Sequence, residues 1–362
     1  MGQPSRNSFT PDCLPLLIGS MPSRDHRKAS ASVFLHTPEI PVWVQLPVHH
    51  QEGMIVQFMP GFPGLTTQDE KWFIQSDGAD FSDALLQFYE EYMAVTEERI
   101  HIDDSRFALT RDVAPGFYLF MEKIPAATIH PRALKGQITG PVTFATSVKD
   151  HGDRAIFYDD QIRDVAIKLL AMKARWQVRQ LSRFGRPVIL FLDEPALAGF
   201  GSSEFISITG ESVISALNEV IDAIHAEGGH AGIHVCANTD WNLIMNTHVD
   251  IINFDAYGYF DRFILYPDAL KSFWDRDGMI AWGIVPTGNP DAIFRETPQS
   301  LTALWKAQMI QIEQLGISPV TILARSLITP SCGLGSLTAD QADHVLGLTQ
   351  NVSRMIRNTS AC

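Results

Sequence analysis

Short apolar runs recur along the chain, and most are separated by segments long enough to form a helix. Runs of this length and composition are typical of buried β-strands. The eight runs comprise residues 14–20, 42–47, 136–142, 188–195, 231–237, 250–256, 279–286 and 320–330.

Between these runs, several segments repeat apolar residues at intervals of three and four, the spacing of one face of a helix. The clearest covers residues 158–185, which has acidic residues near its start and Gly185 at its end. Residues 211–229 and 300–316 show the same pattern and also end at glycine. Strands that alternate with helices predict a parallel sheet, and eight such units predict an α/β fold of the (β/α)8 TIM barrel type.

The chain is long enough for a single barrel domain, because 362 residues with 45% apolar content can bury a substantial core. We predict a flexible N-terminal tail over residues 1–12 and one catalytic barrel over residues 13–362. The stretch from about 48 to 130 is too long for a simple crossover, so it predicts an insertion over the barrel mouth after the second strand. Within it, residues 79–95 predict a helix and residues 106–124 predict a hairpin.

A candidate metal site begins with His234 and Cys236, which stand two positions apart in a predicted strand. Residues at i and i+2 of a strand project from the same face. Asp255 lies at the end of the run at 250–256 and Cys332 just past the run at 320–330, so neighbouring barrel strands would bring all four residues to one rim. Two thiolates with one nitrogen and one oxygen favour zinc. Taken singly, each residue also has a common structural role, as a core thiol, a hydrogen-bonded histidine or a helix cap.

Other polar residues near strand ends are candidates for substrate binding. Gly19 and Ser20 end the first run, where backbone N–H groups and a hydroxyl could hold a carboxylate, although the same pair also makes ordinary turns. Asp193 and Glu194 are adjacent at the end of the fourth run, so at most one of them faces the barrel axis. Glu52 follows the second run and could bind an ammonium group, with solvent exposure as the simpler interpretation.

Two further histidines, His49 and His50, follow the second run directly. A second ligand on the same strand or helix face would lie two or four positions away. Neither histidine has a partner at that spacing, so the sequence does not assign them to a metal site.

Charge and cysteine content narrow the class of partners and the cellular setting. With 41 acidic and 28 basic residues the formal charge is −13, which repels nucleic acid and anionic membrane surfaces. Four cysteines, at positions 13, 236, 332 and 362, do not form a disulfide framework typical of small secreted domains, so we expect a reducing, cytoplasmic setting. No apolar run approaches the roughly 20 residues that span a bilayer.

The chain resembles the C-terminal catalytic barrel of cobalamin-independent methionine synthase. The shared stretches are LIGSMPS, KGQITGPVTF, LDEPAL, GIHVCAN, VDIINFDAYG and PSCGLGSLT, spread between residues 16 and 338. The resemblance implies zinc bound by His234, Cys236, Asp255 and Cys332, with aspartate in place of the family's usual glutamate.

The resemblance also implies a substrate, L-homocysteine. Its carboxylate is expected to meet the N–H groups around Gly19 and Ser20. Its ammonium group is expected to meet Asp193, with help from Glu52. Asp193, His234, Cys236 and Cys332 are therefore the expected catalytic residues.

Two departures from the family concern the methyl donor. The chain has no counterpart of the family's N-terminal barrel half, which makes it similar to the short, core-only methionine synthases. Members that use methyl-folate carry a D-I-H-S motif after the seventh strand, and here the equivalent stretch is WGIVPTGNP, without histidine. Demethylation of a tertiary amine needs a nearby proton donor, whereas cob(I)alamin leaves without one. We therefore expect zinc-dependent transfer of a methyl group from methylcobalamin on a separate corrinoid protein to the zinc-bound thiolate of homocysteine, giving methionine.

Three alternatives remain open at this level. The chain could methylate another alkyl thiol such as coenzyme M, although Asp193 would repel a sulfonate and attract an ammonium group. It could be a metal-free decarboxylase similar to uroporphyrinogen decarboxylase, which has no use for the four metal-ligand candidates. It could also be a non-enzymatic binding protein stabilised by a closed, four-ligand zinc site.

Overall fold

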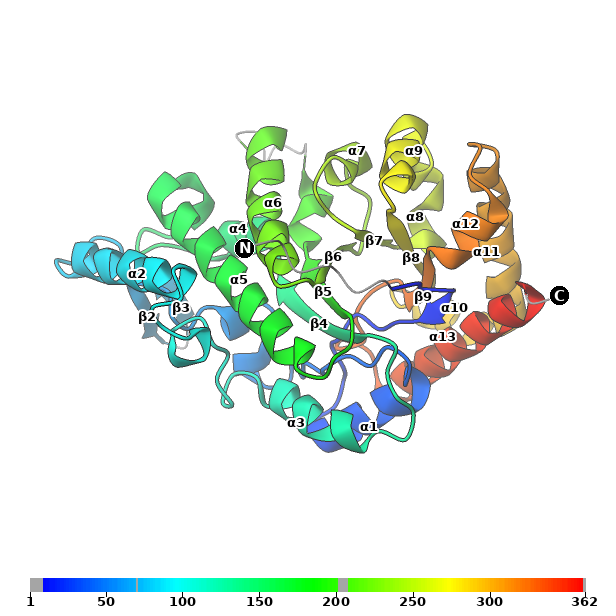
Figure 1. The fold of residues 1–362 in the computed structure, drawn as a ribbon, viewed down its shortest axis with the longest axis horizontal. Helices are drawn as coiled ribbons and strands as arrows, with labels where there is room; N and C mark the ends of the chain where they lie inside the picture. The colour runs from blue at the N-terminus through cyan, green and yellow to red at the C-terminus, as the bar shows by residue number, and fades with distance from the viewer. Residues whose placement is uncertain (1–8, 70, 201–207, 361–362) are drawn as a thin grey trace.

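The fold is built on a curled sheet of seven parallel strands, seen in a computed structural model that describes residues 9–69, 71–200 and 208–360. The strands are β1 (Leu14–Pro15), β4 (Leu134–Thr139), β5 (Val188–Asp193), β6 (His230–Val235), β7 (Ile251–Phe254), β8 (Met279–Val285) and β9 (Ser326–Pro330). Their order is β1-β9-β8-β7-β6-β5-β4, and each neighbouring pair is parallel. Helices flank this sheet, which is therefore an α/β half-barrel (Figure 1).

The expected second strand, residues 42–47, is present as isolated bridges rather than as a regular ladder. Val42 forms a parallel bridge with Lys135 of β4, and Gln45 forms one with Ser20 beyond β1. The segment thus contacts both edges of the sheet. Prolines precede and end it, and because proline has no backbone N–H group to donate, they limit regular pairing.

The helices include the three expected from the apolar spacing. The α-helices are α1 (His26–His36), α2 (Phe81–Thr96), α3 (Pro115–Lys123), α4 (Pro141–Ser147), α5 (Asp160–Ser182), α6 (Gly210–Ala226), α7 (Trp241–Met245), α8 (Ala256–Phe263), α9 (Pro267–Asp275), α10 (Pro290–Arg295), α11 (Pro298–Glu313), α12 (Pro319–Ala324) and α13 (Ala339–Ser360). Predictions for α5, α6 and α11 are confirmed. The Asp159 carboxylate accepts hydrogen bonds from two backbone N–H groups and so caps the start of α5.

Short 3-10 helices connect several of these elements. They are η1 (His50–Glu52), η2 (Val56–Phe58), η3 (Ile102–Asp104), η4 (Ile124–Ala126), η5 (Ile156–Tyr158) and η6 (Pro195–Gly199). No helix in the described part of the chain has both the length and the apolar character needed to cross a membrane.

The region from 48 to 130 contains the expected helix, α2, but the expected hairpin at 106–124 is wrong. These residues include helix α3, and the antiparallel hairpin instead joins β2 (Leu65–Gln68) to β3 (Lys71–Ile74). Pro115 favours the first turn of α3, and Phe117 and Phe120, one helical turn apart, are both buried. Figure 1 shows α2 and the β2–β3 hairpin together at one end of the molecule.

Helix α3 comes very close to the segment that bridges the two sheet edges. A Cβ atom placed on Gly116 would lie 2.0 Å from the backbone oxygen of Val44. Only glycine allows the two backbones to approach this closely.

The apolar run at 320–330 divides into two elements rather than forming one strand. Residues 319–324 form α12, because Pro319 occupies the first turn and the Ser318 hydroxyl accepts a hydrogen bond from Thr321 N–H at 3.1 Å. The strand β9 begins only at Ser326. Of the predicted tail, residues 1–8 lie outside the described residues.

Candidate metal centre

The inner face of the curled sheet changes from apolar to polar toward the carboxyl ends of its strands. Along β5, Ile189 and Phe191 pack in a small apolar cluster with residues of β1, β7, β8 and β9. Alternation places Asp193 on the same face. On β6, a Cβ atom at Gly232 would lie 2.2 Å from the Phe191 ring, so His234, two residues later, also points inward.

Three of the four predicted metal ligands lie together at this polar end. One ligand atom from each of His234, Cys236 and Cys332 lies within 4.8 Å of the others. His234 lies near the carboxyl end of β6, Cys236 follows that strand, and Cys332 follows β9. Parallel strands end at one edge, which is why residues almost a hundred positions apart meet here.

The imidazole of His234 is held in the orientation that a metal ligand needs. Its Nδ1 lies 2.5 Å from the Asn253 Oδ1 atom. The Asn253 amide nitrogen donates to the Ala281 carbonyl and to the Thr329 hydroxyl, both at 2.8 Å, so its oxygen must face His234. The proton therefore resides on Nδ1 of neutral His234. Burial lowers the pKa of this histidine to about 4, and its buried Nε2 has no hydrogen-bond partner among the described residues.

The two thiols interact directly. A hydrogen bond from Cys332 lowers the pKa of the Cys236 thiol to about 7, while the same bond and burial raise the pKa of Cys332. A lone-pair nitrogen beside two thiols is a ligand set that fits zinc. Three protein ligands leave one position of a tetrahedral ion for substrate.

Asp255, the fourth predicted ligand, is not part of the group whose ligand atoms lie within 4.8 Å of one another. Its carboxylate caps α8 by accepting a hydrogen bond from Gly258 N–H at 2.8 Å. Burial raises its pKa to about 6. Direct ligation by Asp255 therefore stays a prediction, whereas its role as a helix cap is visible.

The adjacent acids Asp193 and Glu194 have different surroundings. Glu194 is buried and accepts hydrogen bonds from Val142 N–H, Thr143 N–H and the Thr143 hydroxyl at 2.6–2.9 Å, which anchors the start of α4. The Oδ1 atom of Asp193 has no hydrogen-bond partner among the described residues, and burial raises the pKa of this carboxyl to about 7. Asp193 is thus the acid that remains available to a ligand.

Lys135, on β4, is a buried cation that the sequence analysis did not select. Its ammonium group donates to the Ile18 carbonyl at 2.5 Å and lies 4.4 Å from the centre of the Phe191 ring. Burial lowers its pKa to about 7, and the charge of Asp193 opposes that shift. The predicted run began at residue 136, so Lys135 lay just outside it; β4 starts earlier, and alternation along it places Lys135 on the same face as Gln137.

Gly19 and Ser20 lie at the edge of the same site. Gly19 has a φ of 143°, and a Cβ atom there would lie 2.6 Å from the Gln137 side chain. The Ser20 hydroxyl accepts a hydrogen bond from Gly335 N–H at 3.3 Å. The first strand end therefore packs against the loop that carries Cys332.

The three metal-ligand candidates, Asp193 and Ser20 border a cavity of about 370 Å³. It is lined by Ile18, Ser20, Gln45, Pro47, Glu52, Met54, Asp193, Pro195, His234, Cys236, Cys332, Gly333, Gly335 and Ser336. Its volume is in the range of small-molecule sites. Glu52 is buried in its wall, so the simpler interpretation of an exposed carboxylate is wrong.

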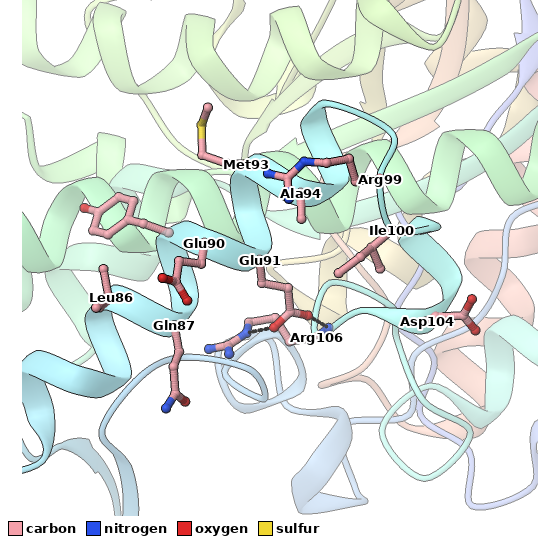
Figure 2. A pocket seen from close by; sticks show the side chains of 11 residues that line it. Leu86, Gln87, Glu90, Glu91, Met93, Ala94, Arg99, Ile100, Asp104 and Arg106 are labelled. Carbon is pink, nitrogen blue, oxygen red and sulfur yellow. Dashed lines mark hydrogen bonds and ion pairs between the residues drawn. The ribbon is translucent and has the colours of Figure 1, made fainter.

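A larger hollow of about 950 Å³ lies elsewhere, beside α2 (Figure 2). Among its lining residues, Glu91 and Arg106 form an ion pair at 2.7 Å. The described residues that line it include neither cysteine nor histidine, so the candidate chemistry belongs to the smaller cavity.

No protein-family model matches the sequence, and no curated protein matches it. Among solved structures, a methyltransferase from Methanosarcina mazei aligns with 98% of this chain and 94% of its own, at 12% identity and a TM-score of 0.55. A B12-independent methionine synthase from Shewanella sp. W3-18-1, in complex with selenomethionine, aligns over 63% of each chain at 16% identity and a TM-score of 0.45. The chain thus spans less than two thirds of that methionine synthase. The likeness to the Methanosarcina protein shows a shared fold.

Proposed function

We propose that this protein is a zinc-dependent methyltransferase that moves a methyl group from methylcobalamin, carried by a corrinoid protein, to the thiol of L-homocysteine, giving methionine. One observation carries the proposal. The His234, Cys236 and Cys332 group opens on a cavity whose wall presents a carboxylate oxygen of Asp193 that has no hydrogen-bond partner in the described part of the chain.

The metal would be held by the Nε2 atom of His234 and the sulfur atoms of Cys236 and Cys332. When bound, zinc supplies Lewis acidity that lowers the pKa of a substrate thiol without redox chemistry. Asn253 fixes the ring of His234 through the Nδ1 contact, as partners of metal-bound histidines commonly do.

The cavity wall matches an amino acid better than an anionic thiol. A buried carboxylate oxygen without a partner is costly, and a substrate ammonium group would satisfy Asp193. Glu52 adds a second carboxylate to the wall, and its Oε2 atom is held by Leu46 N–H at 3.1 Å. Ser20 and the backbone around Gly19 would meet the substrate carboxylate on the opposite side of the amino acid.

The residues at the end of β8 support methylcobalamin, rather than methyl-folate, as the methyl donor. The stretch from 282 to 290 contains no histidine that could protonate a folate nitrogen. In the proposed transfer the substrate thiol gives its proton to solvent, the S–CH3 bond forms, and the Co–C bond breaks. Cob(I)alamin leaves with the electron pair, so no proton donor is required on that side.

The test is methyl transfer from methylcobalamin to homocysteine by the purified chain, with and without a zinc chelator. We expect methionine formation that stops with the chelator and resumes when zinc is restored. Coenzyme M in place of homocysteine serves as the control thiol, since it lacks the ammonium group. Equal activity without metal, faster methylation of coenzyme M, or an equal rate with methyl-folate would each contradict the proposal.

A further inference from the structure

A second group of metal-ligand side chains lies at the rim of the same cavity. His26 is the first residue of α1, His49 precedes η1, and Glu52 ends it. One ligand atom from each lies within 4.8 Å of the others. The two imidazole rings stack with their centres 5.4 Å apart and their planes 13° apart.

The hydrogen bonds of this group show which nitrogen and oxygen atoms could bind a cation. His26 Nε2 lies 2.8 Å from Glu52 Oε1, so a proton lies between these two atoms. A metal ion bound at Nε2 would take the place of that proton while the ring carries its proton on Nδ1. His49 Nε2 lies 3.3 Å from the Arg24 carbonyl oxygen. A carbonyl only accepts, so Nε2 of neutral His49 carries the proton and Nδ1 keeps its lone pair. A backbone carbonyl is a common partner for the second nitrogen of a metal-bound imidazole.

The burial of the three groups also suits an ion. Glu52 is 1% exposed, whereas the side chain of His26 is 20% exposed, so the carboxylate lies inside and the imidazole faces the entry path. A divalent ion bound by two imidazole nitrogens and a carboxylate oxygen would have one negative charge among its protein ligands. A His, His, Glu set is an established ligand set for zinc, with water in the remaining position.

We propose that His26, His49 and Glu52 form a second site for a divalent transition metal such as zinc, separate from the thiol site. Its nitrogen and oxygen ligands contrast with the sulfur ligands of the first site. Thiolates bind zinc more strongly than carboxylates do in such sites, so the rim site fills second.

Occupation of the rim site would engage Glu52, which also lines the substrate cavity. This consequence, unlike the site itself, rests on the proposed function. A cation bound to Glu52 weakens its attraction for the substrate ammonium group. Excess zinc should therefore raise the KM for homocysteine more than it lowers kcat.

The binding test uses the full chain and zinc alone, followed by equilibrium dialysis with elemental analysis. We expect two equivalents of zinc on the wild type and one on the Cys236→Ala/Cys332→Ala variant. Adding His49→Ala to that variant should weaken the remaining site by more than about tenfold. His50→Ala is the matched control, because this neighbouring histidine is exposed and outside the cluster.

Cobalt gives an independent readout. Co²⁺ at the first site should produce thiolate-to-metal charge-transfer absorption, and Co²⁺ at the rim site should bind without it. The proposal is overturned if the double cysteine variant, folded by circular dichroism, binds no metal, or if His49→Ala and His50→Ala bind alike. His26→Gln provides a second variant, expected to match His49→Ala.

The kinetic test separates this inference from the proposed function. Excess zinc should raise the KM of the wild type and leave the KM of His49→Ala unchanged. If no methyl transfer occurs at all, the proposed function fails while the stoichiometry still decides the rim site. Equal inhibition of both proteins by zinc would remove the regulatory consequence.

Discussion

The two histidine clusters of this molecule border one cavity but are built differently. In the thiol group, His234 is fixed by a strand, and Asn253 on the next strand sets its tautomer. In the rim group, His26 begins helix α1, while His49 precedes the short 3-10 helix η1 and Glu52 ends it. A parallel sheet imposes positions on the first cluster, whereas the second depends on how two connecting segments pack.

This difference explains the properties expected of each site. Side chains on strand ends stay in place without a ligand, so little ordering is needed when an ion binds. Groups on turns must be held by their own hydrogen bonds, here the contact between His26 and Glu52. The first site should bind metal tightly and the second reversibly.

The strongest test of the comparison removes a thiol. Cys332→Ala should lose the metal of the first site and reduce methyl transfer by about 10³-fold or more, because Lewis acidity contributes several kcal/mol to catalysis. Metal analysis and the methylcobalamin assay measure the two effects. Cys13→Ala is the control, since Cys13 is a buried thiol that donates to the Leu323 carbonyl outside the site. A Cys332→Ala protein with full activity would contradict the proposed mechanism.

The second test asks whether the neighbouring strand orients the metal ligand. Asn253→Ala removes the acceptor for His234 Nδ1–H and should weaken zinc binding by about 10–100-fold. Thr329→Val removes another partner of Asn253 and leaves the histidine contact, so a much smaller loss is expected. Competition with a chelator gives both dissociation constants. Equal losses of zinc affinity in the two variants would mean that disturbed packing, rather than the lost contact to His234, weakens the site.

The third test separates substrate binding from metal binding. Asp193→Asn should raise the KM for homocysteine about tenfold, because a charged hydrogen bond contributes roughly 1.5–3 kcal/mol, and should leave the zinc content unchanged. Glu194→Gln is the adjacent control. It should lower the melting temperature through the lost anchoring of α4 while changing the KM less. Loss of zinc from Asp193→Asn would place this residue in the metal site instead.

The last test concerns stability rather than metal or substrate binding, at a buried lysine that belongs to neither cluster. Burial lowers the pKa of Lys173 from 10.5 to about 7. Between these values the unfolded chain binds more protons than the folded one, so this lysine makes stability rise with pH from about 7 to 10.5. Below pH 7 the full penalty remains.

Lys173→Met should therefore stabilise the protein at pH 7 by about 1–3 kcal/mol, the cost of a poorly satisfied buried polar group. The gain should shrink as the pH approaches 10.5. Denaturant unfolding at several pH values measures it. A constant difference across that range would show that Lys173 does not titrate on unfolding.

Much of the site followed from alternation along strands. The spacing of His234 and Cys236 predicted a shared face, and parallel strand ends predicted that Cys332 would join them. The same reasoning limited the acids at 193 and 194 to one on the inner face, which the structure identifies as Asp193. Glu52 was harder, because a turn residue has no periodic pattern that reports burial.

Other features of the fold and the site could not be predicted from the local sequence pattern. Asn253 lay inside a predicted apolar run and Lys135 lay one position before another, and a buried polar residue reveals its role only through its partners. His26 approaches His49 across 23 positions, through packing of α1 against a turn. The error at 106–124 arose because consecutive apolar residues fit a strand or a buried helix, and tertiary contacts decided the outcome.

The close approach of Gly116 to Val44 holds helix α3 against the segment at 42–47, which contacts both edges of the sheet. This segment pairs with the sheet only through isolated bridges, so a methyl group introduced at position 116 would displace it from α3. Gln45 of the same segment pairs with Ser20 and lines the cavity. Displacement of the segment would therefore change the shape of the cavity, although position 116 is not part of its lining. Glycine at position 116 is therefore required by the contact between two backbones and not by the reaction.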